Sequence, residues 1–199
     1  MFKTIIFLLL NQFAFAPSLD VPVFHRTNLV LEFNGFKVGW NTDFKAPVWA
    51  YYQLEADDKG LSLKRPLEPF KRDPRVHDKN ISTELYTNSG FDRGHLVPSR
   101  AMGSYYGLKS QLQTYFLSNI VPQEPSLNRR DIKNIESRIY DFDFFQDAEI
   151  QDIYITINYS QDKIKNQISI PENFVFSVIS TDFDENKVIK TFFFLINKK

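Results

Sequence analysis

Residues 88–98 read Asn-Ser-Gly-Phe-Asp-Arg-Gly-His-Leu-Val-Pro, and this stretch says most about the fold and chemistry of the chain. Gly90 and Gly94 break any helical or strand period here, so His95 does not read as a filler of an apolar face. A single histidine is more often structural than catalytic. Its setting, with Arg93 two residues before it and glycines nearby, favours a functional role for His95 over a packing role.

Two later segments add polar positions that are ordinary when each is considered alone. Residues 115–123 read Tyr-Phe-Leu-Ser-Asn-Ile-Val-Pro-Gln, and Asn119 there could simply end an apolar strand. Asn128 follows in Leu-Asn-Arg, where an asparagine could cap the start of a helix. Glu136 could be a surface glutamate. Taken singly, none of these residues predicts a function.

The three segments together, in this order and spacing, resemble the DNA/RNA non-specific endonuclease family. This is the endonuclease G-like branch of the ββα-metal (His-Me finger) nucleases. Weaker similarity extends through residues 46–52 and 170–174, so the resemblance covers most of the chain after residue 28. It implies a ββα-metal catalytic motif and hydrolysis of phosphodiester bonds in both DNA and RNA.

The resemblance also implies roles for individual residues. His95 corresponds to the general base, Arg93 to the motif arginine, Asn119 to the strand asparagine, Glu136 to the helix glutamate and Asn128 to the metal ligand. The implied cofactor is Mg²⁺, for which Mn²⁺ can substitute.

These implied roles are chemically reasonable. A neutral histidine suits a general base near pH 7. Mg²⁺ prefers oxygen ligands and keeps several waters, so one amide oxygen is a credible protein anchor. Glu136 lies eight residues after Asn128, roughly 12 Å along a straight helix, which favours a water-orienting role over a shared place on the metal.

Three further arginines are expected to bind substrate phosphates. Arg65 is the best match to an upstream arginine of the family, and Arg129 and Arg138 lie on the expected helix. Two positions depart from the family pattern, because Ile132 replaces a tryptophan and Tyr140 replaces an arginine. These departures bear on outer phosphate contacts and on rate, and the preference between DNA and RNA stays undetermined.

The rest of the sequence predicts a mixed α+β fold with a mainly antiparallel central sheet. Asn34-Gly35 between two apolar runs is a strong hairpin signal, and the polar, proline-containing stretch over residues 57–94 predicts a long irregular segment. A helix is expected over residues 126–142, where isoleucines form one apolar stripe. Strands are expected over residues 29–33, 36–40, 48–54, 112–119, 150–158, 174–180 and 188–196.

Composition limits the class of protein. The chain has 199 residues, which suits one large domain, and its 20 phenylalanines provide a substantial core. The 24 basic and 24 acidic residues balance, so bulk positive charge is not what would hold nucleic acid. The absence of cysteine excludes disulfides, zinc fingers and cysteine nucleophiles.

The first residues predict a targeting segment. A lysine, a short apolar run and Ala14-Phe15-Ala16 indicate a signal peptide over residues 1–18, followed by a single domain over residues 19–199. Secretion is the first expectation, with a mitochondrial presequence or a buried strand as alternatives. The apolar run is too short to span a membrane, so no stable membrane association is expected.

Other functions and assemblies stay open at this level. A weakened nuclease-fold protein that only binds nucleic acid, or a secreted interaction domain, would also fit the composition. Dimerisation is open too, although members of the resembled family are often dimers.

Overall fold

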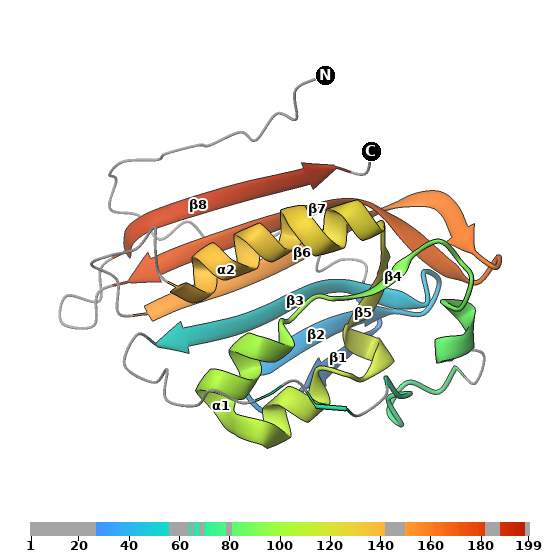
Figure 1. The fold of residues 1–199 in the computed structure, drawn as a ribbon, viewed down its shortest axis with the longest axis horizontal. Coiled ribbons are helices and arrows are strands. Elements are labelled where there is room, and N and C mark those ends of the chain that lie inside the picture. The colour runs from blue at the N-terminus through green and yellow to red at the C-terminus, as the bar shows by residue number, and fades with distance from the viewer. Residues whose placement is uncertain are drawn as a thin grey trace.

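Figure 1 shows a computed structural model, which describes residues 27–55, 64, 66–67, 70–78, 81–141, 150–181 and 188–197. The predicted signal segment and Arg65 lie outside these residues. The elements are β1 (Leu29–Glu32), β2 (Phe36–Asn41), β3 (Ala46–Glu55), β4 (Asp92–His95), α1 (Ser99–Gln113), β5 (Ile120–Gln123), a π-helical segment (Leu127–Ile132), α2 (Lys133–Asp141), β6 (Ile150–Ile164), β7 (Ile168–Thr181) and β8 (Val188–Asn197), with 3₁₀ turns at Thr83–Leu85 and Leu117–Asn119.

The main sheet has the order β1-β2-β3-β6-β7-β8, and every neighbouring pair is antiparallel. This confirms the expected α+β class with an antiparallel central sheet. The predicted hairpin is also present, since Phe33 N–H donates to Phe36 C=O at 2.9 Å across the turn. Gly35 there has φ +85°, a conformation that glycine adopts without strain.

The core lies between the sheet and the segments that cover it. Alternate residues of β6 and β7 are buried, as the two-residue period of a strand requires: Ile153, Ile155 and Ile157 on β6, and Phe174, Phe176 and Val178 on β7. Ile132 and Ile139, from the π-helical segment and α2, belong to the same core cluster. In Figure 1, α2 runs in front of β6 and β7.

A separate two-stranded sheet carries the motif residues. β4 pairs with β5 in antiparallel register, with Asp92 opposite Gln123 and His95 opposite Ile120. A Cβ on Gly94 would lie 2.0 Å from the Cδ of the buried Gln123 side chain, so any other residue between Arg93 and His95 would force Gln123 to move. The π-helical segment and α2 follow β5, which completes a ββα arrangement.

The expected strand over residues 112–119 is wrong. Helix α1 ends at Gln113, residues 117–119 form a 3₁₀ turn, and strand β5 begins only at Ile120. Thr114 N–H donates to the carbonyls of Ser110 and Gln111, which continues helical bonding into this stretch. The central sheet positions belong instead to β3 and β6.

Helix α1 was not expected from the sequence at all. It contains Gly107 at φ +81°, where two helical pieces meet at a kink. This break interrupts the periodic pattern by which an amphipathic helix is recognised. The helix expected over residues 126–142 is present as the π-helical segment followed by α2, and Phe142 lies outside the described residues.

Candidate active site

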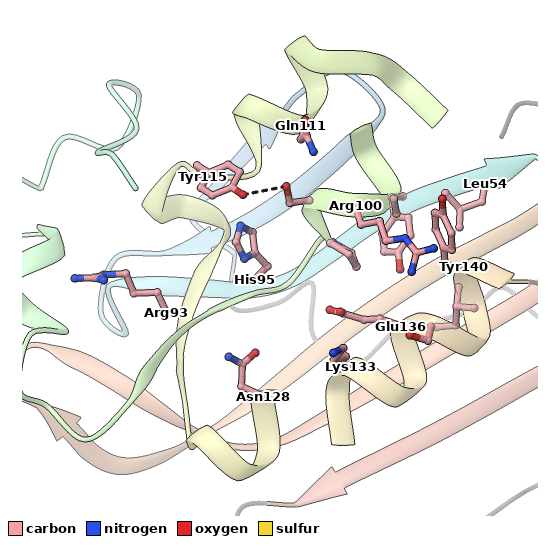
Figure 2. Close-up of a pocket in the computed structure, with 16 residues that line it drawn as sticks. Leu54, Arg93, His95, Arg100, Gln111, Tyr115, Asn128, Lys133, Glu136 and Tyr140 are labelled. Carbon is pink, nitrogen blue, oxygen red and sulfur yellow. Dashed lines mark hydrogen bonds between the residues drawn. The ribbon is translucent and has the colours of Figure 1, made fainter. Parts of the chain in front are cut away.

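A pocket of about 460 Å³ opens where β4, the first turn of α1 and the helical segment after β5 meet (Figure 2). Four of the sequence-predicted residues line it: Arg93, His95, Asn128 and Glu136. Asn119, Arg129 and Arg138 are not among its lining residues, and Arg65 lies outside the described part of the chain.

His95 is the last residue of β4 and is half-buried among aromatic rings. The Tyr115 ring meets it edge-on with centroids 5.0 Å apart, and the Phe70 ring lies at 5.4 Å. The Tyr115 hydroxyl accepts a hydrogen bond from Ser99 Oγ at 3.3 Å, which ties Tyr115 to the start of α1. This packing limits how the imidazole can turn while its ring still borders the pocket.

Asn128 is oriented by Asp92. Its Nδ2 donates to Asp92 Oδ2 at 3.0 Å. Arg129 donates to the same carboxylate through Nε (2.9 Å) and Nη2 (2.7 Å). These Arg129 bonds, then the Asn128 bond, hold the pKa of Asp92 below its usual range against partial burial. An ionised carboxylate only accepts hydrogen bonds, so it selects the amide nitrogen and turns the Asn128 oxygen elsewhere.

Asn128 is therefore not a helix cap. It lies within the helical segment, its backbone N–H donates to Glu124 C=O at 2.9 Å, and its side chain reaches across to β4. Asp92 received no role in the sequence analysis, although it stands in the quoted stretch. A contact between residues 36 positions apart leaves no local pattern in a single sequence.

The π-helical segment explains why Asn128 and Glu136 share one pocket. Eight residues of a regular α-helix make about 2.2 turns, which would set the two side chains on different faces. A π turn takes in one extra residue, and the separation then comes close to two full turns. In Figure 2, the Glu136 side chain extends toward the part of the pocket where His95 and Asn128 lie.

Glu136 is a carboxyl group in a desolvated position. Burial raises the pKa of Glu136 to about 8, because the charged form loses hydration there. A carboxyl group of this kind in a pocket is a marker of functional sites, although structural networks can produce the same shift.

Asn119 supports the backbone next to the pocket through hydrogen bonds of its buried side chain. Its Oδ1 accepts from Val97 N–H at 3.0 Å, and its Nδ2 donates to the carbonyls of Val97 (3.1 Å) and Thr114 (3.0 Å). The side chain is fully buried. It fixes the chain just after His95 to the end of α1, and its amide has no donor left to reach a substrate.

The arginines differ in where they point. Arg93 Nη2 donates to Thr83 C=O at 3.1 Å, and Figure 2 shows its guanidinium directed away from His95. Arg129 is exposed and engaged with Asp92. Arg138 is exposed on α2.

Sequence reasoning gave no binding or catalytic role to two further lining residues. Arg100 lies on the first turn of α1 and Tyr140 on α2, and both border the pocket. The Arg100 Cζ lies 3.9 Å from the centre of the Tyr140 ring. Of the two departures from the family pattern, Ile132 is a core residue and Tyr140 forms a pocket wall.

A sequence model of the family described as "DNA/RNA non-specific endonuclease" matches residues 21–199. This match agrees with the ββα arrangement and with the residues around the pocket, and it places the chain among the nucleases. The chain belongs to the DNA/RNA non-specific endonuclease family.

Individual relatives are similar over different lengths. Mitochondrial endonuclease G of Homo sapiens is 34% identical over 94 residues, which cover 46% of this chain and 31% of that protein. Nuclease C1 of Cunninghamella echinulata var. echinulata is 28% identical over 185 residues, covering 84% of this chain and 71% of that protein. The match to endonuclease G thus spans less than a third of that relative.

A solved structure shares the fold. The crystal structure of the EndoG/EndoGI complex superposes with a TM-score of 0.71 at 18% identity, covering 85% of this chain and 74% of the matched one. Among the helices that the structure describes, none combines the length and hydropathy needed to cross a membrane.

Replacing Asn119 by alanine should lower the free energy of unfolding by at least about 2 kcal/mol. The change leaves a buried N–H and two buried carbonyls without their partners, each costing roughly 1–3 kcal/mol. Urea denaturation measures this, with Asn158→Ala as the control, because the exposed Asn158 only donates to Asn173. Equal stability of the two variants would contradict the structural role of Asn119.

The stability of the metal-free protein should fall with rising pH because of Glu136. Its folded-state pKa of about 8 lies above the unfolded value of 4.5. Between these values the folded state holds a proton that the unfolded state releases, so this contribution to stability falls as pH rises from about 4.5 to about 8. Urea denaturation in EDTA should show a flatter dependence for Glu136→Gln. Identical slopes for both proteins would show that Glu136 does not titrate in this window.

Proposed function

We propose that the chain is a metal-dependent endonuclease that hydrolyses phosphodiester bonds in DNA and RNA. His95 acts as the general base, and Asn128 holds one Mg²⁺. The observation that carries this proposal is the arrangement of His95, Asn128 and Glu136 around one pocket, with Asp92 fixing the amide of Asn128. The nuclease names of the relatives support it.

The residues of the pocket suit Mg²⁺. Within the described residues, no three His, Cys, Asp or Glu side chains converge on one point, so a closed zinc site has no ligand set here. Asn128 offers an amide oxygen, and Mg²⁺ is commonly held by few protein ligands plus water and substrate phosphate. Glu136 would act on water beside the ion and not as a ligand. When bound, Mg²⁺ supplies stabilisation of the charge that develops on the phosphate and the leaving oxygen.

The protein groups provide proton transfer and orientation. His95 takes a proton from the attacking water, and the aromatic packing around its ring keeps it aimed at the pocket. Glu136 orients water. A divalent cation bound nearby would favour the carboxylate form of Glu136. Contacts to the phosphate backbone carry no sequence information, which accounts for cleavage without sequence preference.

We further propose that residues 1–18 are a targeting segment removed from the mature protein. Secretion remains a prediction, and the mitochondrial alternative gains support from relatives named mitochondrial endonuclease G and mitochondrial nuclease EXOG. N-terminal sequencing of the mature protein, with organelle fractionation, separates the two destinations. Homodimer formation stays a prediction from the resemblance.

Replacing His95 by alanine should lower cleavage by about 10²–10⁴, the usual range for a general acid–base group. Nicking of supercoiled plasmid measures the rate, and thermal melting confirms that the variant folds. His77→Ala is the matched control, because His77 is exposed and does not line the pocket. If His95→Ala kept more than a tenth of the activity, His95 would not be the general base.

Asn128→Ser should lose most activity and require more Mg²⁺. Serine is too short to present an oxygen where the amide oxygen stands, and it also loses the bond to Asp92. The initial rate against Mg²⁺ concentration measures the loss, and thermal melts separate it from instability. Normal cleavage by a normally melting Asn128→Ser protein would move the metal site elsewhere. A chelated wild-type protein that still cuts would remove the metal from the proposal.

A further inference from the structure

We propose that Arg100, held against Tyr140, binds a backbone phosphate next to the one being cleaved. This rests on the proposed function, and it names the preferred substrate as a strand with at least two neighbouring phosphates. The pocket would thus prefer an oligonucleotide to a small diester that carries a single phosphate.

Tyr140, the partner of Arg100, is a buried side chain that its neighbours hold in place. Tyr140 is 9% exposed, its hydroxyl lies 2.9 Å from Ser104 Oγ, and Tyr105 packs edge-on against its ring at 6.0 Å. Arg100 is exposed, and its Cζ lies 3.9 Å from the ring centre. This contact restricts a flexible side chain before any substrate arrives, so less conformational entropy is lost on binding.

The contact with Tyr140 is made over the ring, with the Arg100 Cζ 3.9 Å from the ring centre. A guanidinium carries five N–H donors in a planar fork. Arg100 and Tyr140 both line the pocket. An arginine fork in this position matches the two oxygens of a phosphate.

Arg100 and Tyr140 line the same pocket as the residues proposed for catalysis but lie to one side of them. Tyr140 lies four residues after Glu136 on α2, so the two side chains share a face about one helical turn, or roughly 5.4 Å, apart. In Figure 2, Arg100 and Tyr140 lie on the far side of Glu136 from His95 and Asn128. In duplex DNA each strand carries one charge about every 3.4 Å of helix axis, so successive phosphates follow one another closely. A strand with one phosphate beside His95 therefore brings another toward Arg100.

The pocket lining carries more cationic side chains than acidic ones, since Glu136 is the acidic residue among those described. Among its described lining residues, the cationic ones are Arg93, Arg100 and Lys133. Arg93 donates to Thr83 C=O and points away from His95. Arg100 also sits on the first turn of α1, where the partial positive charge of the helix end adds to its own.

The experiment compares a ten-nucleotide single strand with bis(p-nitrophenyl) phosphate, which has one phosphate. For Arg100→Ala we expect KM on the strand to rise about tenfold with kcat within about twofold, so that the preference for the strand over the small diester falls about tenfold. Arg100→Gln, which keeps the size of the side chain, should behave similarly. Lys109→Ala is the control, because Lys109 is exposed on the same helix and does not line the pocket.

A binding measurement makes the test independent of cleavage. Fluorescence anisotropy with the same labelled strand in EDTA, across a range of salt concentrations, should show weaker binding for Arg100→Ala. The slope of log affinity against log salt should be shallower by about one contact. Tyr140→Leu should weaken binding in the same direction, because it removes the ring that holds Arg100.

The outcomes separate the two proposals. If the wild-type protein cuts neither substrate while Arg100→Ala still binds the strand more weakly, the proposed function fails and the phosphate site stands. If Arg100→Ala matches Lys109→Ala in substrate preference, affinity and salt slope, the phosphate site is overturned, and Arg100 only covers Tyr140.

Discussion

The site depends on the Asp92 carboxylate, which joins β4 to the helical segment after β5. It accepts from Asn128 on one oxygen and from Arg129 on both. Asp92 and His95 occupy the two ends of the same four-residue strand. The bond that orients Asn128 therefore also sets the helix relative to His95. An acceptor-only group is required at this point, because a donor would let the Asn128 amide turn its oxygen away from the pocket.

The small β4–β5 sheet alone could not hold His95 and Asn128 in fixed positions relative to each other. It has four residue pairs, and two-stranded sheets of this size are marginal by themselves. Side-chain hydrogen bonds to neighbouring segments add stability to this sheet, and two asparagines form them in different ways. Asn119 uses both ends of its amide on the backbone of Val97 and Thr114 and is fully buried. Asn128 bonds to Asp92 through its nitrogen, which leaves its oxygen for the metal-binding role proposed above.

The sequence predicted those structural features that neighbouring residues encode, and it missed those that depend on contacts between distant segments. The hairpin at Asn34-Gly35 and the outer strands were found because turn chemistry and two-residue alternation lie within a few residues. Helix α1 was missed because Gly107 divides it, and residues 112–119 were then misread as a strand. The resemblance singled out His95, Asn128 and Glu136, which the structure places around one pocket. It could not show that Arg129 turns to Asp92 while Arg100 faces the pocket, because both depend on contacts between distant segments.

Neutral net charge makes the position of each cation decisive. With 24 basic and 24 acidic residues, long-range attraction to a polyanion is weak, so under the proposed function the affinity for nucleic acid must come from groups fixed close to the substrate. A lysine on an open surface would lose much of its effect to salt and side-chain motion. An arginine seated on a buried tyrosine loses less, since the ring limits its motion and shields one face from water. In the proposed phosphate site, Tyr140 contributes to charge recognition without carrying a charge, because it places a cation from α1 beside a face of α2.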